Sequence, residues 1–227
     1  MSLLVGTLAF TAACAKKKHL ARVPVSSAPS PSRPVLPPEN AQPGDVIETG
    51  LASWYGHPYD GRQAADGEIY DMEKMTAAHR TLSFNTWLRV ENVANGKTVD
   101  VRITDRGPFI GGRILDLSHA AARQIEIIGP GTAQVRLRVL AAPQVPESAL
   151  FGVQVGAFQL KENAERTRAN MERSYGAARI VERPGDAALY RVLVGNEQTP
   201  QAAVQLGRRI RAENPVPEAF VVRIDLR

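Results

Sequence analysis

Side chains that transfer protons are concentrated in the middle of the chain, where Glu68, Asp71, His79 and Asp105 occur. Carboxyl and imidazole groups are among the side chains that most often give or take protons in catalysis. Asp105 is the strongest candidate for such an acid/base, because it ends a strand-like run and precedes a Gly-Pro turn that would hold it at a rim. The alternative is an aspartate that caps this turn through its own backbone.

Three stretches around these residues carry a specific pattern: GLASWYG at 50–56, ADGEIYDMEKMTAAHRTLSFNT at 65–86 and TDRGPFIGGRILDLSHAAA at 104–122. Together they resemble the rare lipoprotein A family over nearly the whole middle of the chain. The resemblance implies an all-β, six-stranded double-psi beta-barrel. It also implies a lytic transglycosylase that cleaves the bond between N-acetylmuramic acid and N-acetylglucosamine in peptidoglycan and leaves a 1,6-anhydromuramyl end.

The residue types fit this chemistry. A leaving glycosidic oxygen needs a proton, and a hydrolase also needs a second carboxylate to activate water or to attack. A lytic transglycosylase needs less, because the C6 hydroxyl of the sugar is the nucleophile and one carboxyl group can serve both proton transfers. Such a group needs a raised pKa, from burial or from a neighbouring carboxylate. By resemblance Asp105 is the catalytic aspartate, and Glu68 either raises its pKa or binds the saccharide; the alternative for Glu68 is a solvated loop residue.

The remaining candidates near this site have supporting or binding roles. By resemblance Asp71 and His79 lie in the same groove, where His79 would orient a carboxylate or would be merely structural. Trp54 and Tyr55 are suited either to stacking on sugar rings or to packing in the core, and alternation along a strand prevents both from pointing the same way. Arg106 is suited to binding carboxylate or acetamido groups, or to pairing with a nearby acid. We expect Asp116 to cap the helix that comes after it.

Residues 46–141 are predicted to form the barrel that positions these side chains. Short runs with strand character alternate with turn signals, which favours a small barrel with little helix. The runs 87–93 and 97–103 flank Asn95-Gly96, a strong hairpin signal because both residues tolerate positive φ. One helix is expected from Ser118 to Ile125, with Ser118 as its cap.

Residues 150–227 contain a weak internal repeat, in which FGVQVGAFQLKENAERTRANME at 151–172 matches the layout of YRVLVGNEQTPQAAVQLGRRI at 190–210. Each half reads as a strand, a polar turn and a helix, and two further strands complete an α+β ferredoxin-like βαββαβ pattern. VQVGAF at 153–158 and YRVLVG at 190–195 resemble the SPOR family. That resemblance implies binding of peptidoglycan glycan strands that have lost their stem peptides.

Strand alternation suggests which residues of this domain would contact glycan. If Val153 and Val155 face the helices, then Gln154, Phe158 and Arg191 face the open side of the sheet. The same topology occurs in RNA-binding RRM domains, which carry several aromatic residues on the two central strands. Phe158 is the one aromatic candidate here, so nucleic acid is not the expected partner.

The first 45 residues are predicted to be a targeting segment and a tether. Residues 1–14 form a short apolar run that ends in small residues before Cys14, as in a bacterial lipobox whose cysteine becomes lipidated. The alternative is an unlipidated signal with an incidental cysteine. Residues 15–45 are rich in Pro and Ser and read as a disordered tether, and 142–149 read as a linker. These features favour a lipoprotein on the periplasmic face of the outer membrane, enriched at the division septum.

Several other functions find no support. The histidines lack clustered ligand spacing, so no metal is expected, and glycine-rich nucleotide motifs do not occur, so no cofactor is expected. The net charge of +5 suits a polyanionic or surface-bound partner but does not identify one. The alternative to an enzyme is a non-catalytic peptidoglycan-binding or wall-loosening protein of the division site.

Overall fold

The computed structural model describes residues 43–143, 149–183, 189–216 and 218–225. The signal-like segment with Cys14, nearly all of the predicted tether and most of the predicted linker fall outside these ranges. Among the helices described, none combines the length and the apolar character needed to cross a membrane.

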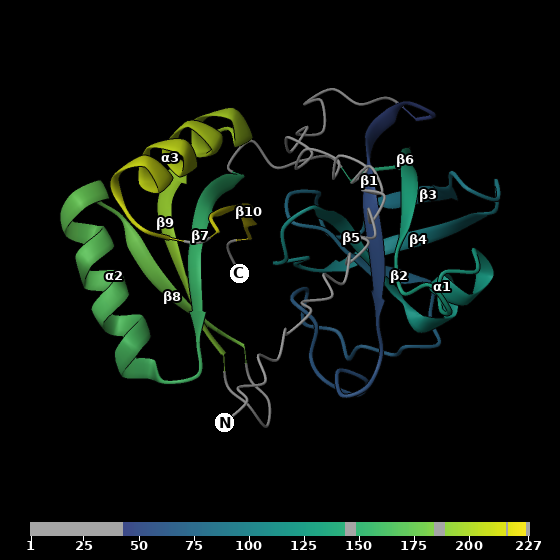
Figure 1. The fold of residues 1–227 in the computed structure, drawn as a ribbon, viewed down its shortest axis with the longest axis horizontal. Coiled ribbons are helices and arrows are strands. Elements are labelled where there is room, and N and C mark those ends of the chain that lie inside the picture. The colour runs from purple at the N-terminus through teal and green to yellow at the C-terminus, as the bar shows by residue number, and fades with distance from the viewer. Residues whose placement is uncertain (1–42, 144–148, 184–188, 217, 226–227) are drawn as a thin grey trace, which may run out of the picture. The chain divides into compact units, whose positions relative to one another are not determined.

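Residues 46–141 form a closed six-stranded barrel (Figure 1). Its strands, in chain order, are β1 (Val46–Tyr55), β2 (Thr76–Ala78), β3 (Trp87–Asn92), β4 (Thr98–Asp105), β5 (Arg113–Ser118) and β6 (Ala133–Ala141). Around the barrel they run in the order β1-β5-β2-β4-β3-β6. The pairs β1–β5 and β2–β4 are parallel and the other neighbours are antiparallel. The predicted double-psi beta-barrel is therefore confirmed.

Strand alternation fills the barrel. On β3, Leu88 and Val90 are fully buried, whereas Trp87 and Arg89, which alternate with them, are exposed. The same alternation buries a set of branched side chains on the other strands: Val99, Val101, Ile103, Val135, Leu137 and Val139. Each fully buried side chain of this kind contributes about 1.5–3 kcal/mol to stability.

Two local sequence signals are confirmed. The β3–β4 pair is an antiparallel hairpin, and Gly96 in its turn has a φ of 70°, which a glycine adopts without strain. Helix α1 (His119–Gln124) has Ser118 as its N-cap, and the Ser118 side chain accepts a hydrogen bond from the Ala121 amide at 3.2 Å. The expectation that Asp116 caps this helix was wrong. Asp116 lies within β5, and its carboxylate accepts a hydrogen bond from Ser53 on β1.

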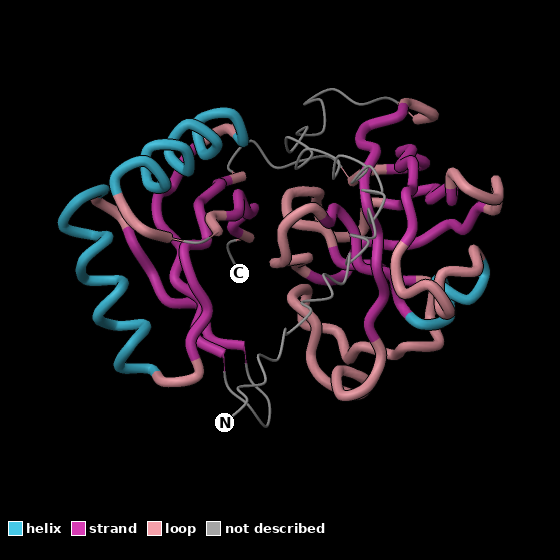
Figure 2. Tube along the Cα trace, viewed as in Figure 1, coloured by secondary structure: helices cyan, strands magenta, loops and turns pink. Residues whose placement is uncertain are grey.

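The C-terminal elements form the predicted βαββαβ unit (Figure 2). In chain order they are β7 (Leu150–Phe158), α2 (Lys161–Tyr175), β8 (Ala178–Arg183), β9 (Leu189–Glu197), α3 (Pro200–Glu213) and β10 (Phe220–Ile224). The sheet is antiparallel, in the order β10-β7-β9-β8. Both helices pack on one face, where Ala164, Met171 and Ile210 meet the valines of β7 and β9.

The predicted position of Phe158 on the open face of this sheet was wrong. The register of β7 against β9 shifts between Gln154 and Gly156, so β7 carries an extra residue there. Such a bulge reverses the alternation beyond it. Phe158 therefore packs against the helix-side cluster, with its ring so close to Gly156 that a Cβ there would lie 2.8 Å from it.

Candidate active site

A bulge in β4 aims Asp105 out of the barrel. Val99, Val101 and Ile103 face the interior, so simple alternation would place Asp105 there too. The register between β2 and β4 shifts, however: Ala77 pairs with Ile103, whereas Ala78 pairs with Asp105. The extra residue on β4 turns Asp105 to the outer face, and bulges are over-represented next to active sites for this reason.

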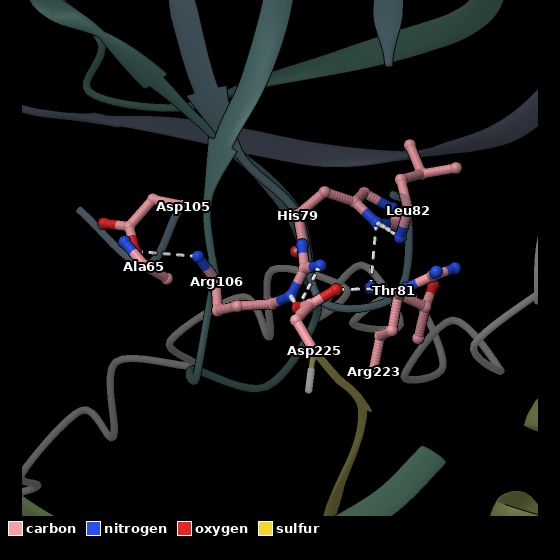
Figure 3. Close-up of polar contacts among 8 residues, drawn as sticks. All are labelled: Ala65, His79, Thr81, Leu82, Asp105, Arg106, Arg223 and Asp225. Atoms are coloured by element: carbon pink, nitrogen blue, oxygen red, sulfur yellow. Dashed lines mark hydrogen bonds and ion pairs between the residues drawn. The ribbon is translucent and has the colours of Figure 1, made fainter. Parts of the chain in front are cut away.

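Asp105 is held in place by backbone groups (Figure 3). Its Oδ1 accepts hydrogen bonds from the amides of Ala65 at 3.1 Å and Arg106 at 2.8 Å. The residue is only 2% exposed. Because Oδ1 already accepts two N–H groups, a proton on this carboxyl group would be carried by Oδ2.

The last residues of β4 also fasten the two loops that flank β2. The carbonyl oxygens of Thr104 and Ile103 accept hydrogen bonds from the amides of Asp66 at 3.1 Å and Asn85 at 2.9 Å. The Asp105 carbonyl accepts another from the His79 amide at 3.1 Å. Backbone contacts thus bring residues from both loops to the end of β4.

Asp66 is an acidic residue of this site that the sequence analysis missed. Burial raises the pKa of Asp66; the carboxylates of Glu68 and Asp105 raise it further, while the Glu68 amide and Arg102 oppose the shift. Its Oδ2 is buried without a hydrogen-bond partner among the described residues. The available signal was its position in Ala65-Asp66-Gly67-Glu68, but an Asp-Gly pair in a loop is equally typical of a turn.

Glu68 lies on the solvent side of this acidic group. Arg102 on β4 donates to it twice, from Nη1 to Oε1 at 2.9 Å and from Nη2 to Oε2 at 2.6 Å. This bidentate bond is the main reason why the pKa of Glu68 is lowered. Arg102 also lies 3.8 Å from Asp66, so Glu68 is joined to the buried carboxylates through a guanidinium.

His79 does orient a carboxylate, but its partner is Glu48, which the sequence analysis did not identify. His79 Nε2 lies 3.0 Å from Glu48 Oε2, and both side chains are buried. Nδ1 accepts hydrogen bonds from the amides of Thr81 and Leu82, at 3.2 and 3.1 Å (Figure 3). Nε2 therefore carries the hydrogen of a neutral imidazole. Burial lowers the pKa of His79, and the hydrogen bond with Glu48 opposes this shift.

Two arginines close the turn after Asp105. Arg106 is buried, with its guanidinium 3.8 Å from the centre of the Phe84 ring and its Nη1 donating to the His79 carbonyl at 3.2 Å. Arg80 Nη1 donates to the carbonyls of Pro108 at 3.0 Å and Arg113 at 2.8 Å. Arg106 thus contacts protein groups at the rim.

Asp71, Trp54 and Tyr55 have partners of their own outside the acidic group. The Asp71 carboxylate accepts a hydrogen bond from the Glu73 amide at 2.9 Å, which closes a local turn. Trp54 meets His119 edge-on at 5.4 Å and packs against the barrel core. Tyr55 points the other way and stacks on Tyr70 with ring centres 4.3 Å apart, as alternation requires.

A second carboxyl group lies across β2 from Asp105. Ala78 pairs with Asp105 on one side and with Asp116 of β5 on the other. Asp116 in turn pairs with Ser53 of β1, whose Oγ donates to Asp116 Oδ1 at 2.5 Å. Paired residues of neighbouring strands place their side chains on the same face. Ser53, Asp116, Ala78 and Asp105 therefore form one row across four strands.

In the C-terminal sheet, Gln154 pairs with Leu193, and Arg191 lies two residues before Leu193 on β9. This places Gln154 and Arg191 on the face opposite the helices, as predicted. The move of Phe158 to the helix side removes the one aromatic residue that the RNA-binding alternative had on the open face of the sheet.

Comparisons with known proteins identify both folded regions. Residues 47–137 match the family model described as lytic transglycolase, and residues 147–223 match that of the SPOR domain. Among solved structures, an expansin of Clavibacter michiganensis shows 17% identity over 66% of this chain and 80% of that chain, with a TM-score of 0.35. A similarity of this degree supports no conclusion about activity.

Several curated relatives are similar to this chain. An endolytic peptidoglycan transglycosylase RlpA of Vibrio cholerae is 41% identical over 62% of this chain and 56% of its own length. That of Neisseria meningitidis is 47% identical over 47% of this chain and 44% of its own. The chain thus spans about half the length of these two relatives. The protein of the same name from Campylobacter jejuni is 34% identical over 77% of this chain and 71% of its own length. By this similarity the chain belongs to the RlpA family.

Proposed function

We propose that this chain is a lytic transglycosylase that cleaves the bond between N-acetylmuramic acid and N-acetylglucosamine in peptide-free peptidoglycan. The observation that carries the proposal is the bulge in β4, which aims Asp105 to the outer face beside the carboxyl groups of Asp66 and Asp116. A group of acids in a partly desolvated environment is suited to proton transfer. The relatives named above are called endolytic transglycosylases, which agrees with this assignment.

Asp105 is the acid/base in this proposal. The glycosidic oxygen leaves with a proton, and the C6 hydroxyl of the muramic acid closes on C1 to form the 1,6-anhydro end. Glu68 and Asp71 contribute negative charge and saccharide contacts at the rim, and Tyr55 offers an aromatic ring for stacking. His79 acts as a positioning residue, because it holds the amides of Thr81 and Leu82.

The C-terminal sheet would select the substrate, and the N-terminal segment would fix the protein in the cell envelope. Gln154 and Arg191 offer an amide and a guanidinium for hydrogen bonds to sugar hydroxyl and acetamido groups. Lipidation of Cys14 at the outer membrane, enrichment at the septum and a role in daughter-cell separation complete the proposal. Metabolic labelling with a fatty-acid analogue, compared between the native chain and Cys14→Ser, tests the anchor.

The central experiment incubates the purified chain with glycan strands stripped of peptides by an amidase and searches for 1,6-anhydro ends by mass spectrometry. We expect such ends from the native chain and at least 100-fold fewer from Asp105→Asn, because a general acid/base contributes about 10²–10⁴-fold to a rate. Folded native protein that yields no anhydro ends would overturn the proposal.

One observation favours a second candidate function. Asp105 is 2% exposed, which suits a residue that stabilises the barrel rim as well as one that meets a substrate. The second candidate is a protein that binds and loosens peptidoglycan without cleaving it. It predicts retained binding to glycan strands, no anhydro ends, and equal behaviour of the native chain and Asp105→Asn.

A further inference from the structure

Asp116 and Asp105 flank Ala78 on one face of the barrel wall. Both are direct partners of Ala78, Asp105 from β4 and Asp116 from β5. Neighbouring strands lie about 4.8 Å apart, so the two aspartate backbones are roughly 10 Å apart. Both carboxyl groups lie next to the turn at Gly107, where a Cβ would lie 3.8 Å from Ala78 Cβ and from Asp116 Oδ2.

The Asp116 side chain is largely buried but keeps part of its surface exposed to solvent. Its Oδ1 accepts the Ser53 hydroxyl and lies 3.6 Å from Arg113 Nε. Its Oδ2 faces the turn after Asp105, since a Cβ on Gly107 would lie 3.8 Å from it. The Asp116 side chain keeps 17% of its surface exposed, compared with 2% for Asp105 as a whole residue. Asp116 is therefore the more accessible of the two carboxyl groups.

The surroundings of Asp116 raise its pKa above that of an ordinary surface aspartate. Burial raises the pKa of Asp116 most strongly, and the Asp105 carboxylate adds to this shift. The Ser53 hydrogen bond and the guanidinium groups of Arg113 and Arg80 act in the opposite direction. Two nearby carboxyl groups in unlike environments are how enzymes separate an acid from a base.

We infer that Asp116 is a second catalytic carboxyl group, which donates the proton to the leaving oxygen while Asp105 accepts the proton of the C6 hydroxyl. The inference rests on the proposed transglycosylase activity. It assigns the two proton transfers to two residues, instead of assigning both to Asp105. The bond from C1 to the leaving O4 breaks as O4 takes the Asp116 proton. The bond from O6 to C1 forms as the hydroxyl proton passes to the Asp105 carboxylate. Return of a proton from Asp105 to Asp116 completes the cycle, with no water consumed.

The stereochemistry of the product fits this division. The 1,6-anhydro bridge occupies the same face of the sugar ring as the β-glycosidic bond that it replaces. The donor and the acceptor of protons must therefore approach from one side, next to each other. Asp116 and Asp105, on one face of the wall with Ala78 between them, meet this requirement, whereas two carboxyl groups on opposite sides of a groove would suit an inverting hydrolase.

The test compares Asp116→Asn with the native chain and with Asp100→Asn, on the same peptide-free glycan strands. Asp100 also lies on β4, but it forms an exposed ion pair with Arg89. We expect Asp116→Asn to lower kcat by at least 100-fold with glycan binding unchanged, and Asp100→Asn to stay within about twofold of the native rate. Thermal unfolding of each variant verifies the fold.

A second arm does not require an inactive variant. Ser53→Ala removes a hydrogen bond that favours the ionised form of Asp116, so the alkaline limb of the rate profile should move to higher pH. Arg113→Gln should move this limb in the same direction. A limb that stays in place in both variants would overturn the assignment of Asp116 as the acid.

The outcomes separate this inference from the proposed function. If the native chain forms anhydro ends, Asp105→Asn does not, and Asp116→Asn keeps more than a tenth of the native rate, then Asp116 is no catalytic residue and the proposed function stands. If the native chain forms no anhydro ends at all, both the proposed function and the role of Asp116 are wrong.

Discussion

The imidazole of His79 and the carboxylate of Glu48 form a buried pair 3.0 Å apart that links the loop after β2 to the barrel wall at β1. The other ring nitrogen of His79 accepts the Thr81 and Leu82 amides. All polar atoms of the imidazole are thus used inside the protein. His79 thereby joins Glu48 on β1 to the backbone of Thr81 and Leu82.

Removal of Glu48 should destabilise the fold. Glu48→Ala leaves the Nε2–H group of His79 buried without its acceptor, which costs about 1–3 kcal/mol. Urea unfolding at pH 7 measures this loss. Glu48→Gln keeps an acceptor oxygen and should lose less than half as much; equal losses in the two variants would mean that the hydrogen bond is not the cause.

His79 should make the fold sensitive to mild acid. Its pKa is lowered in the folded state, so the unfolded chain takes up this proton first as the pH falls. The stability that His79 contributes is complete above its ordinary pKa of 6.5 and is lost as the pH falls below that value, by at most about 1.4 kcal/mol per pH unit. Unfolding free energies of the native chain and His79→Gln between pH 7.5 and 5 measure the effect. The native curve should fall more steeply than that of the variant, and parallel curves would contradict the assignment.

Replacement of Asp66 should have the opposite dependence on pH. Its pKa is raised in the folded state, so its contribution is most favourable below the ordinary value of 3.8 and is lost as the pH rises through the folded pKa. Asp66→Asn keeps an oxygen to accept the Glu68 amide and removes the buried charge. We expect this variant to be more stable relative to the native chain at pH 7 than at pH 3.5, by about 0.5–1 kcal/mol. Chemical unfolding at the two pH values tests this, and the reverse order would show that the folded state stabilises the ionised form of Asp66.

The C-terminal sheet offers a test that separates packing from binding. Phe158 packs against the helix-side cluster, so Phe158→Ala should lower the free energy of unfolding by about 2–4 kcal/mol. Gln154→Ala and Arg191→Ala, on the other face, should weaken retention of the chain on peptide-free glycan. Arg191→Ala should also leave stability within about 1 kcal/mol. Sedimentation with such glycan and thermal unfolding give the two readouts. Loss of stability in Arg191→Ala with unchanged retention would exclude this face as the binding surface.

Local signals in the sequence predicted much of the fold. Asn95-Gly96 marked the β3–β4 hairpin, Ser118 marked the start of α1, and alternating runs marked the strands of both folded regions. Each of these signals depends on residues within a few positions of one another. The prediction that Glu68, His79 and Asp105 belong to one site came instead from the resemblance to a known family.

Features that depend on register could not be predicted in this way. A single extra residue turns Asp105 outward on β4, and another turns Phe158 inward on β7. The partnership of Glu48 with His79 joins positions 31 residues apart, and that of Ser53 with Asp116 joins positions 63 apart. Only the closure of the barrel brings such residues together. For this reason the sequence predicts that Asp116 caps the helix that follows it in the chain, whereas its side chain contacts Ser53 on the neighbouring strand β1.

The loops around β2 are fastened to the end of β4 through main-chain amides and carbonyls, among them those of Asp66, Asn85 and His79. Any residue other than proline can supply these groups. Many side chains of these loops can therefore be substituted while the backbone hydrogen bonds to β4 are kept. We therefore expect substitutions in these loops to alter saccharide contacts without disturbing the barrel wall that carries the acids.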